Sequence, residues 1–115
     1  MSSEPQVRAV RHAADAVEID LHVSASLDFF PDHFPRLGIL PGVVQIDWAL
    51  SLGRQHLPVD GAFLGLRSIK FVNPILPGAD LTLSVSRPAR NELAFAYRAG
   101  ARTFSSGRAL FGLRA

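Results

Sequence analysis

Residues 32–48, DHFPRLGILPGVVQIDW, are the stretch around which the rest of the chain must fold. Its first half carries Pro35 and Gly38, which break regular structure, so it predicts a loop. Its second half predicts a helix from Pro41 to about residue 56, because proline fits the first helical turn, where its missing N–H costs nothing. Next to it, Gly42 lets another group approach the backbone closely. We therefore expect a loop that leads into a helix start at the centre of the fold.

The predicted helix is apolar on almost every side. Only Gln45, Asp47 and Ser51 interrupt the apolar run before Arg54. A helix of this kind is expected to be buried on almost every side, which predicts a central helix wrapped by a sheet. Such burial would favour the neutral form of the Asp47 carboxyl, which could then donate a proton. The alternative interpretation makes Asp47 a surface residue or a structural partner of Arg54.

Alternating apolar and polar residues predict strands on both sides of the helix. In residues 16–24, for example, Val17, Ile19 and Leu21 alternate with polar side chains. Six strands are expected: residues 6–12, 16–24, 62–73, 81–87, 93–99 and 102–113. Two strands, one helix and four strands predict the α+β class, with an antiparallel sheet curled around one long helix. Because an exposed sheet edge and the apolar loop at 27–39 both need a covering layer, we also expect a dimer.

The composition predicts a single domain over residues 1–115. With 48% hydrophobic residues the chain can form a core, and no apolar run approaches the roughly 20 residues of a membrane span. The N-terminus lacks signal-peptide features and cysteine is absent, so we expect a cytoplasmic protein. The histidines have no ligand spacing, which predicts no metal. Scattered arginines without interleaved aromatic residues argue against nucleic acid, and leave solvated faces or an acidic protein partner as interpretations.

Three groups suited to proton transfer meet at the predicted helix start. The loop supplies the His33 imidazole and the helix supplies the Asp47 carboxylate. The first N–H groups of a helix, here including that of Gly42, have no partner inside the helix and favour a carbonyl oxygen or an anion. A base or acid, a carboxylate and an oxyanion donor are the minimum equipment for proton transfer next to a carbonyl.

Two blocks of the sequence resemble a known family. Residues 33–35 (HFP), residues 39–43 (ILPGV) and Asp47 resemble the active-site segment of the hotdog-fold 3-hydroxyacyl-(acyl carrier protein) dehydratases, and residues 69–81 (IKFVNPILPGADL) resemble their next shared block. The likeness is nearest to the ApeI-like, aryl-polyene-type branch, which shares Gln45, Asp47, Trp48 and the SSG of residues 105–107. The resemblance runs from about residue 16 to the C-terminus. It departs at Arg36, where many members have glycine, and at Asp47, where one major branch has glutamate.

The resemblance implies a role for each matching residue. It implies that His33 is the catalytic histidine, that Asp47 is the catalytic carboxylate, and that Gly42, with Val43 beside it, offers backbone N–H groups to the thioester carbonyl. It also implies a dimer in which the histidine and the carboxylate of one site come from different subunits. The implied reaction is dehydration of a 3-hydroxyacyl-acyl carrier protein to the trans-2-enoyl thioester, without a cofactor, in fatty-acid, polyene or related lipid biosynthesis.

The resemblance also suggests where the substrate and its carrier would bind. The acidic partner expected from the arginines would be acyl carrier protein, and Arg36 and Arg67 are the docking candidates. Four aromatic residues could line the acyl tunnel, or could pack in the core or in a subunit interface instead: Phe29, Phe30, Phe34 and Trp48.

Two other functions remain open for the same fold. A hotdog thioesterase would activate water against the carbonyl and would have no use for a His33 loop paired with Asp47. A non-catalytic subunit could instead complete a heteromeric dehydratase with a paralogous hotdog chain, although an intact His33 and Asp47 argue against this function.

Overall fold

The structure, a computed structural model, describes residues 4–26 and 38–112. These residues contain two strands, one helix and four further strands, as the sequence predicted. In chain order they are β1 (Gln6–Ala13), β2 (Ala16–His22), α1 (Gly42–His56), β3 (Ala62–Phe71), β4 (Asp80–Ala89), β5 (Glu92–Ala99) and β6 (Arg102–Gly112). The apolar loop predicted at 27–39 lies mostly outside the described residues, and so does any packing role for it.

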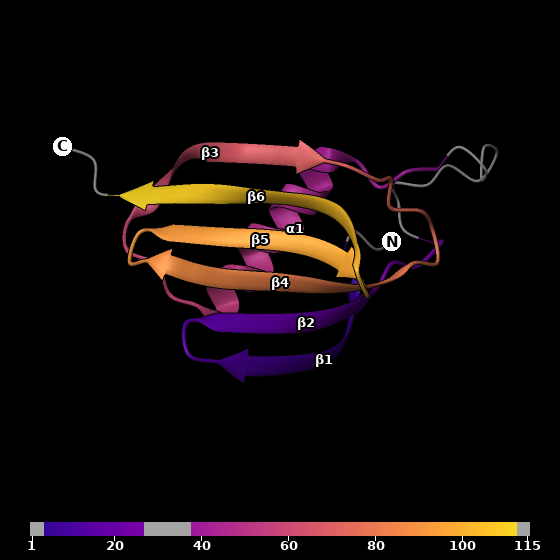
Figure 1. Ribbon diagram of the computed structural model, residues 1–115, viewed down its shortest axis with the longest axis horizontal. Coiled ribbons are helices and arrows are strands. Elements are labelled where there is room, and N and C mark those ends of the chain that lie inside the picture. Colours follow the sequence, from indigo (N-terminus) through magenta and orange to yellow (C-terminus); the bar gives the residue numbers. More distant parts are fainter. Residues whose placement is uncertain (1–3, 27–37, 113–115) are drawn as a thin grey trace.

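All six strands form one antiparallel sheet in the order β1-β2-β4-β5-β6-β3. Two-residue turns join β1 to β2, β4 to β5 and β5 to β6, and Asp15 in the first of these turns has a positive φ of 55°. Aspartate tolerates this left-handed conformation better than most residues do. The single helix crosses one face of the curved sheet (Figure 1). The expected α+β hotdog architecture, a sheet wrapped on one long helix, is therefore confirmed.

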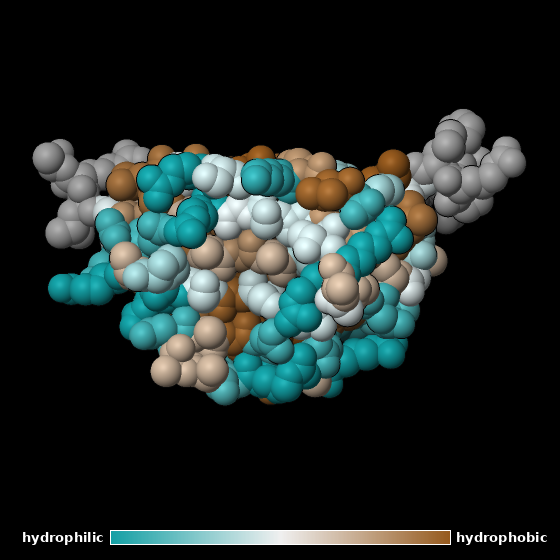
Figure 2. Space-filling model, viewed as in Figure 1, coloured by the Kyte–Doolittle hydropathy of each residue, from teal (hydrophilic) through white to brown (hydrophobic). Residues whose placement is uncertain are grey.

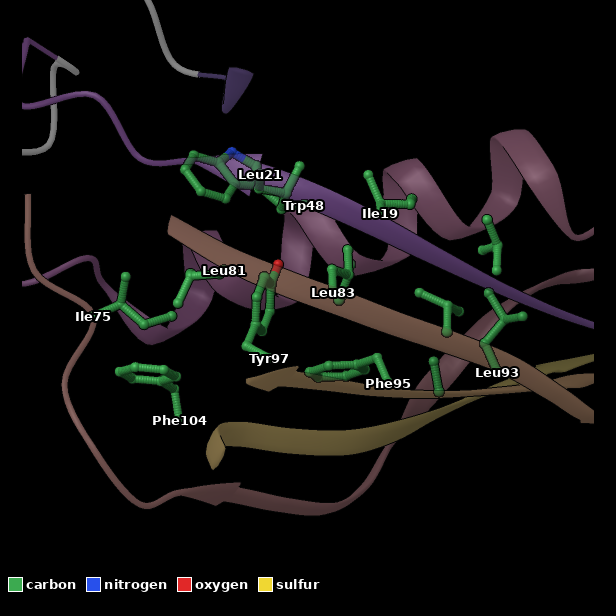
Figure 3. Close-up of a cluster of buried hydrophobic side chains, with 14 of the residues drawn as sticks. Ile19, Leu21, Trp48, Ile75, Leu81, Leu83, Leu93, Phe95, Tyr97 and Phe104 are labelled. Atoms are coloured by element: carbon green, nitrogen blue, oxygen red, sulfur yellow. The ribbon is translucent and has the colours of Figure 1, made fainter. Parts of the chain in front are cut away.

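The core fills the space between the sheet and α1. Alternate residues of β2, β4 and β5 point inward because side chains along a strand alternate between its two faces. Trp48 and Ala49 of the helix pack against them at 3% and 0% exposure. Figure 3 shows the larger of these side chains meeting between the layers. The buried strand residues include Val17, Ile19, Leu21, Leu81, Leu83, Val85, Leu93, Phe95 and Tyr97.

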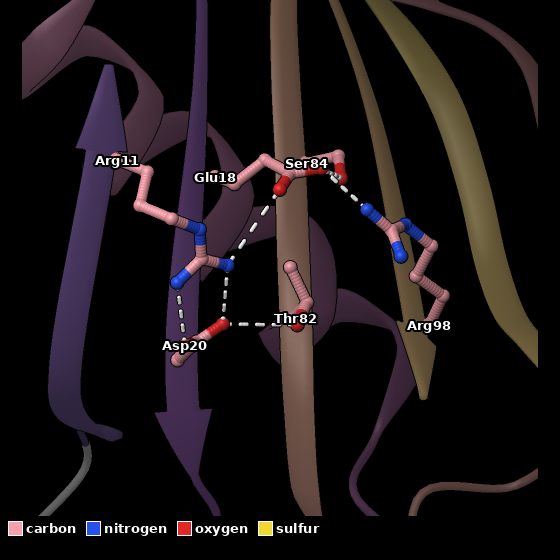
Figure 4. A network of polar contacts seen from close by, with 6 residues as sticks. All are labelled: Arg11, Glu18, Asp20, Thr82, Ser84 and Arg98. Carbon is pink, nitrogen blue, oxygen red and sulfur yellow. Dashed lines mark hydrogen bonds and ion pairs between the residues drawn. The ribbon is translucent and has the colours of Figure 1, made fainter. Parts of the chain in front are cut away.

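The opposite face of the sheet carries paired charges. Arg11 of β1 donates two hydrogen bonds to the Asp20 carboxylate, at 2.7 and 2.8 Å, and Thr82 donates a third at 3.0 Å (Figure 4). These bonds lower the pKa of Asp20 to about 2, with the Arg11 bond as the largest cause. Arg98 of β5 pairs with Glu18 in the same network. For these arginines, therefore, the interpretation as a solvated face holds.

The helix is covered on one side only, which corrects the prediction that it is buried all round. Val43 is 74% exposed, and Asp47 and Ser51 continue the same open face at four-residue intervals. A single sheet covers one face of a helix, and the described residues supply no second layer. Arg54 stacks on the Phe111 ring, 4.9 Å from its centroid, so the alternative that paired it with Asp47 is wrong, whereas the placement of Asp47 at the surface is right.

The edge strand β3 is unusually apolar on its exposed surface. Phe63, Leu64 and Leu66 are 42%, 55% and 41% exposed. Figure 2 shows hydrophobic residues along this edge and hydrophilic ones over much of the sheet face. The strand is also irregular, because its register with β6 shifts between Arg67 and Lys70, around a positive φ of 57° at Ser68. An apolar edge strand is a ready template for another chain.

Three predicted strands differ from the structure by two residues at one end. The strand expected at 16–24 ends at His22. The strand expected at 62–73 ends at Phe71, and the strand expected at 81–87 runs from Asp80 to Ala89, through Pro88. Proline is tolerated there because the register of β4 with β5 shifts between Ser86 and Ala89, and an irregularity relieves the ladder of one donor.

Membrane and metal features can be assessed for residues 4–26 and 38–112. No helix in these ranges is long and apolar enough to cross a membrane. Nor do three or more His, Asp or Glu side chains gather there in a way that could hold a metal ion.

Candidate active site

The start of α1 presents unpaired backbone donors. The Pro41 carbonyl accepts the N–H groups of Val44 and Gln45, each at 3.1 Å. The N–H groups of Gly42 and Val43 come too early in the helix to have an intrahelical partner, and none is bonded to another residue in the described part of the chain. At the positive end of the helix dipole, these groups can bind a carbonyl oxygen or an anion.

An apolar pocket of about 410 Å³ lies against this helix start. We call it the helix-start pocket, and its lining residues are Ile39, Leu40, Gly42, Gln45, Phe71, Val72, Asn73 and Pro74. A Cβ atom at position 42 would lie 2.6 Å from Cζ of the Phe71 ring. A side chain at position 42 would force the half-exposed Phe71 ring to move. The packing of this ring therefore favours glycine, in addition to any substrate that approaches the backbone, and sequence reasoning missed this second reason.

Asp47 lies in a different pocket. Its side chain belongs to the open face of α1 and, in the described part of the chain, forms no ion pair or hydrogen bond. The expectation that an apolar helix buries this carboxyl within one chain is therefore wrong. Together with Glu4, Pro5, Val7, Trp48, Ser51, Leu52 and Gln55 it lines a space of about 310 Å³, which we call the Asp47 pocket. These two pockets share no lining residue, so neither of them brings Asp47 and Gly42 together within the described part of the chain.

Trp48 has two environments. Its ring belongs to the core between α1 and the sheet (Figure 3), and its edge borders the Asp47 pocket. The packing alternative therefore accounts for most of this side chain, and its role in an acyl tunnel stays a prediction.

A buried polar residue, Gln45, ties the helix start to the sheet. Gln45 is 3% exposed, and its amide Nε2 donates to the Leu40 carbonyl at 3.0 Å. Its Oε1 accepts a 2.7 Å hydrogen bond from the hydroxyl of Ser105 in β6, which is 1% exposed. The Leu40 N–H in turn donates to the Ile75 carbonyl at 2.8 Å. The sequence analysis assigned no role to Gln45. The signal that could have revealed one was a single amide side chain in an otherwise apolar helix.

The hydroxyl of Tyr97 makes a further bond to the same helix. It donates to the backbone carbonyl of Gln45 at 2.6 Å, and the ring is completely buried. Burial raises the pKa of the Tyr97 phenol well above its usual value, and the negative charge of Asp47 adds to the effect.

Several predicted site residues lie outside the described residues: His33, Phe29, Phe30, Phe34 and Arg36. Their roles stay predictions. The other docking candidate, Arg67, lies on β3 with its guanidinium 3.6 Å from the Glu92 carboxylate, which Arg108 also contacts.

Comparison with known proteins decides the family. The sequence profile described as ApeI dehydratase, of the ApeI-like family, matches residues 9–108. The chain belongs to the ApeI-like dehydratase family. A similar structure is "The Dehydratase Heterocomplex ApeI:P from Xenorhabdus doucetiae", with 30% identity, a TM-score of 0.82, and coverage of 93% of this chain and 96% of that one. An uncharacterised protein from Erwinia carotovora is 32% identical over 95% of this chain and 96% of that one, with a TM-score of 0.78.

Other proteins similar to this ApeI-like chain match it over less of their length or share only the fold. The FabZ 3-hydroxyacyl-[acyl-carrier-protein] dehydratase of Erythrobacter litoralis is 32% identical over 66% of this chain and 56% of that protein. The FabZ of Ruminiclostridium cellulolyticum is 35% identical over 54% and 49%. The chain thus spans about half the length of these curated relatives. Thioesterase superfamily member 2 from Mus musculus is 15% identical, covers 92% of this chain and 87% of that one with a TM-score of 0.69, and so shows the shared fold alone.

Proposed function

We propose that the chain dehydrates a 3-hydroxyacyl thioester, carried by acyl carrier protein, to the trans-2-enoyl thioester. The proposal rests on the two chemical groups that helix α1 presents in a chain of the dehydratase family. Beside an apolar pocket the helix presents the Gly42 N–H, which has no partner among the described residues, and it carries the Asp47 carboxyl five residues later on its open face. These are the two groups that the reaction needs from a helix, an oxyanion donor and a proton donor.

The first half of the proposed reaction is removal of the C2 proton. That proton is weakly acidic, and its removal moves negative charge onto the thioester oxygen. The Gly42 N–H would bind this oxygen at the positive helix end, and one such donor is worth roughly 3–4 kcal/mol in other enzymes. His33 would take the proton on an imidazole nitrogen, because the unperturbed pKa of histidine near 6.5 suits a general base at neutral pH.

The second half is loss of the C3 hydroxyl. Hydroxide is a poor leaving group, so a carboxyl must protonate it as the C3–O bond breaks and the C2=C3 double bond forms. Asp47 would supply this proton, and water would leave. Asp47 is exposed in the single chain, so its carboxyl is shielded from solvent only when a second layer covers the open face of α1. Desolvation of a carboxyl favours the protonated form that this role requires.

That second layer would be another hotdog subunit. Among the described residues the helix-start pocket and the Asp47 pocket share no lining residue, which supports a site that takes one pocket from each of two subunits. The open β3 edge, with Phe63, Leu64 and Leu66, offers both unpaired backbone groups and apolar surface for the contact. The partner would be a second copy or a paralogous chain, and the similar dehydratase from Xenorhabdus doucetiae, which is a heterocomplex, supports the second option.

Acyl carrier protein would approach the end of the sheet where β3 stops and α1 begins. Arg67 is already partly neutralised by Glu92, which weakens it as a docking residue. Arg102 has its guanidinium 3.2 Å from the Oδ1 atom of Asn73, which lines the helix-start pocket, whereas Lys70 lines a separate pocket beside Ser106 and Gly107. Arg102 has no carboxylate partner in the described part of the chain, so charge reversal at Arg102 should raise the apparent KM for an acidic carrier protein.

A mass-spectrometric assay tests the reaction. The purified protein is incubated with a 3-hydroxyacyl-acyl carrier protein, beside His33→Ala, Asp47→Asn and the control Asp60→Asn. Asp60 is an exposed carboxylate on the loop after α1, paired with Arg90 and remote from both pockets. We expect the wild type and the control to remove one water, and both site variants to leave the substrate intact.

The same assay distinguishes the other functions. Release of free acid by the wild type would indicate a thioesterase. An intact acyl group that loses water only after a second hotdog subunit is added would indicate a non-catalytic or partner-dependent subunit. Full turnover by Asp47→Asn would remove Asp47 from the mechanism.

A further inference from the structure

The segment between Leu40 and Gln45 is held at both ends by buried hydrogen bonds. At one end, the Leu40 N–H donates to the Ile75 carbonyl at 2.8 Å, and its own carbonyl accepts from the Gln45 amide at 3.0 Å. At the other end, the Gln45 amide oxygen accepts from Ser105 at 2.7 Å. We call Leu40, Gln45 and Ser105 the amide clamp. All three residues are at least 97% buried.

The chemistry of the clamp requires glutamine. One side chain must donate to a carbonyl on the chain before the helix and accept from a hydroxyl on β6, and a primary amide offers a donor and an acceptor side by side. An aliphatic residue would satisfy neither Leu40 nor Ser105, and buried polar groups without partners are costly. The structure shows no buried side-chain nitrogen or oxygen without a partner in its described residues, so the clamp is complete.

The clamp encloses the donors that the proposed function uses. Gly42 and Val43 lie inside the clamped segment, and their N–H directions follow from the orientation of the peptide planes between Leu40 and Gln45. An oxyanion donor works only within about 2.7–3.1 Å of the developing charge, so a small rotation of one peptide plane removes its effect. On its pocket side this segment faces the ring of Phe71, which is 53% exposed and can move, so packing there does not fix the peptide planes as the buried hydrogen bonds do.

We propose that Gln45 is a positioning residue, which with Ser105 aims the Gly42 N–H at the thioester carbonyl. The inference rests on the proposed function, since it assigns a second residue to the same oxyanion site. Gln45 itself does not touch the substrate's reacting atoms in this proposal. It acts through the backbone of the helix start.

Gln45→Met tests the proposal, with Tyr97→Phe as the matched control. Methionine has a similar length and volume but removes both hydrogen bonds of the Gln45 side-chain amide. Tyr97→Phe removes a buried hydrogen bond to the same residue's backbone carbonyl and leaves the amide clamp intact. We expect Gln45→Met to lower kcat roughly tenfold to hundredfold, with KM within about twofold. Tyr97→Phe should keep kcat within about twofold, although both variants lower the midpoint of thermal unfolding.

A spectroscopic measurement separates positioning from stability. A saturated acyl-acyl carrier protein without a 3-hydroxyl group cannot react, and isotope labelling of its thioester carbonyl isolates the C=O stretch in an infrared difference spectrum. Binding to the wild type and to Tyr97→Phe should lower the stretching frequency, because a well-aimed N–H polarises the bond. Binding to Gln45→Met should leave it near the free value. If Gln45→Met does not fold, Ser105→Ala, which removes one bond of the clamp, should give a smaller shift than the wild type.

The outcomes for the two proposals are distinct. A wild type that dehydrates its substrate and polarises the carbonyl, with unchanged kcat and unchanged frequency in Gln45→Met or Ser105→Ala, would overturn the positioning role alone. Equal losses of kcat in Gln45→Met and Tyr97→Phe would also overturn it, since stability would then explain both. A wild type that neither dehydrates nor polarises the thioester would overturn the proposed function itself.

Discussion

Tyr97 makes the stability of this protein sensitive to alkaline pH in a way that one substitution removes. It is the single tyrosine of the chain, its ring is fully buried, and its hydroxyl donates to the Gln45 carbonyl at 2.6 Å. Burial raises its pKa in the folded protein, whereas in the unfolded chain it ionises near the ordinary value of about 10. Below about pH 10 both states keep the proton and the stability is complete. Above that pH only the unfolded state loses it, so folding becomes less favourable.

The size of the effect follows from proton linkage. One proton that only the unfolded state releases costs about 1.4 kcal/mol of unfolding free energy per pH unit, or about 2 kcal/mol between pH 10 and 11.5. Tyr97→Phe loses a buried hydrogen bond worth about 1 kcal/mol but has no phenol to ionise. The wild type should therefore be about 1 kcal/mol more stable than the variant at pH 8, and about 1 kcal/mol less stable at pH 11.5.

Urea unfolding followed by circular dichroism at the two pH values measures this reversal. The near-ultraviolet absorbance of tyrosinate gives an independent reading, because no other residue of the chain is a tyrosine. We expect tyrosinate to appear together with unfolding. A folded protein whose phenol titrates near pH 10, or a variant that stays less stable at both pH values, would refute the buried hydrogen bond.

Three further substitutions test separate parts of the structure. Gly42→Ala should lower kcat about tenfold or more. Adding Phe71→Ala should not restore kcat, because the new Cβ still blocks the approach of the thioester carbonyl. Recovery in the double variant would mean that glycine is needed only to make room for the Phe71 ring. Leu66→Lys on the β3 edge should convert a dimer into a monomer in sedimentation experiments. It should change the unfolding free energy of the monomer by no more than about 0.5 kcal/mol. An unchanged assembly would place the interface elsewhere. Arg11→Gln should raise the carboxyl pKa of Asp20 from about 2 toward its ordinary value, as followed by carbon NMR. In the wild type Asp20 adds stability above about pH 4 that is lost as the pH falls toward 2, and the variant should lack this acid-dependent loss; a pKa that stays near 2 would contradict the ion pair.

Local sequence patterns predicted most of the fold. The alternation of Val17, Ile19 and Leu21 identified the inward face of β2, and proline at position 41 marked the helix start. These features depend on neighbours within a few residues, so the periodicity of the sequence and the backbone preferences of single residues are enough to predict them. The shift in β3 at Ser68 had no such signal, because serine has no preference for a positive φ.

The environment of the site depended on distant residues and could not be predicted in the same way. An apolar helix indicates burial, but it does not say whether the second covering layer belongs to the same chain, and Asp47 proved to be exposed in the single chain. The amide clamp joins Gln45 to Ser105, sixty positions away, and only the pairing of the strands brings them together. The resemblance singled out both residues without indicating that they touch.

Hydration of a trans-2-enoyl-acyl carrier protein in water labelled with the heavy oxygen isotope tests the dehydratase function most directly. The reaction is the reverse of the proposed dehydration, and the position of the label identifies the chemistry. We predict that the wild type places the label on the C3 hydroxyl of a product that is still bound as a thioester, and that Asp47→Asn places none. Label in a released carboxylic acid, or equal labelling at C3 by Asp47→Asn, would contradict dehydration at a site built on Gly42 and Asp47.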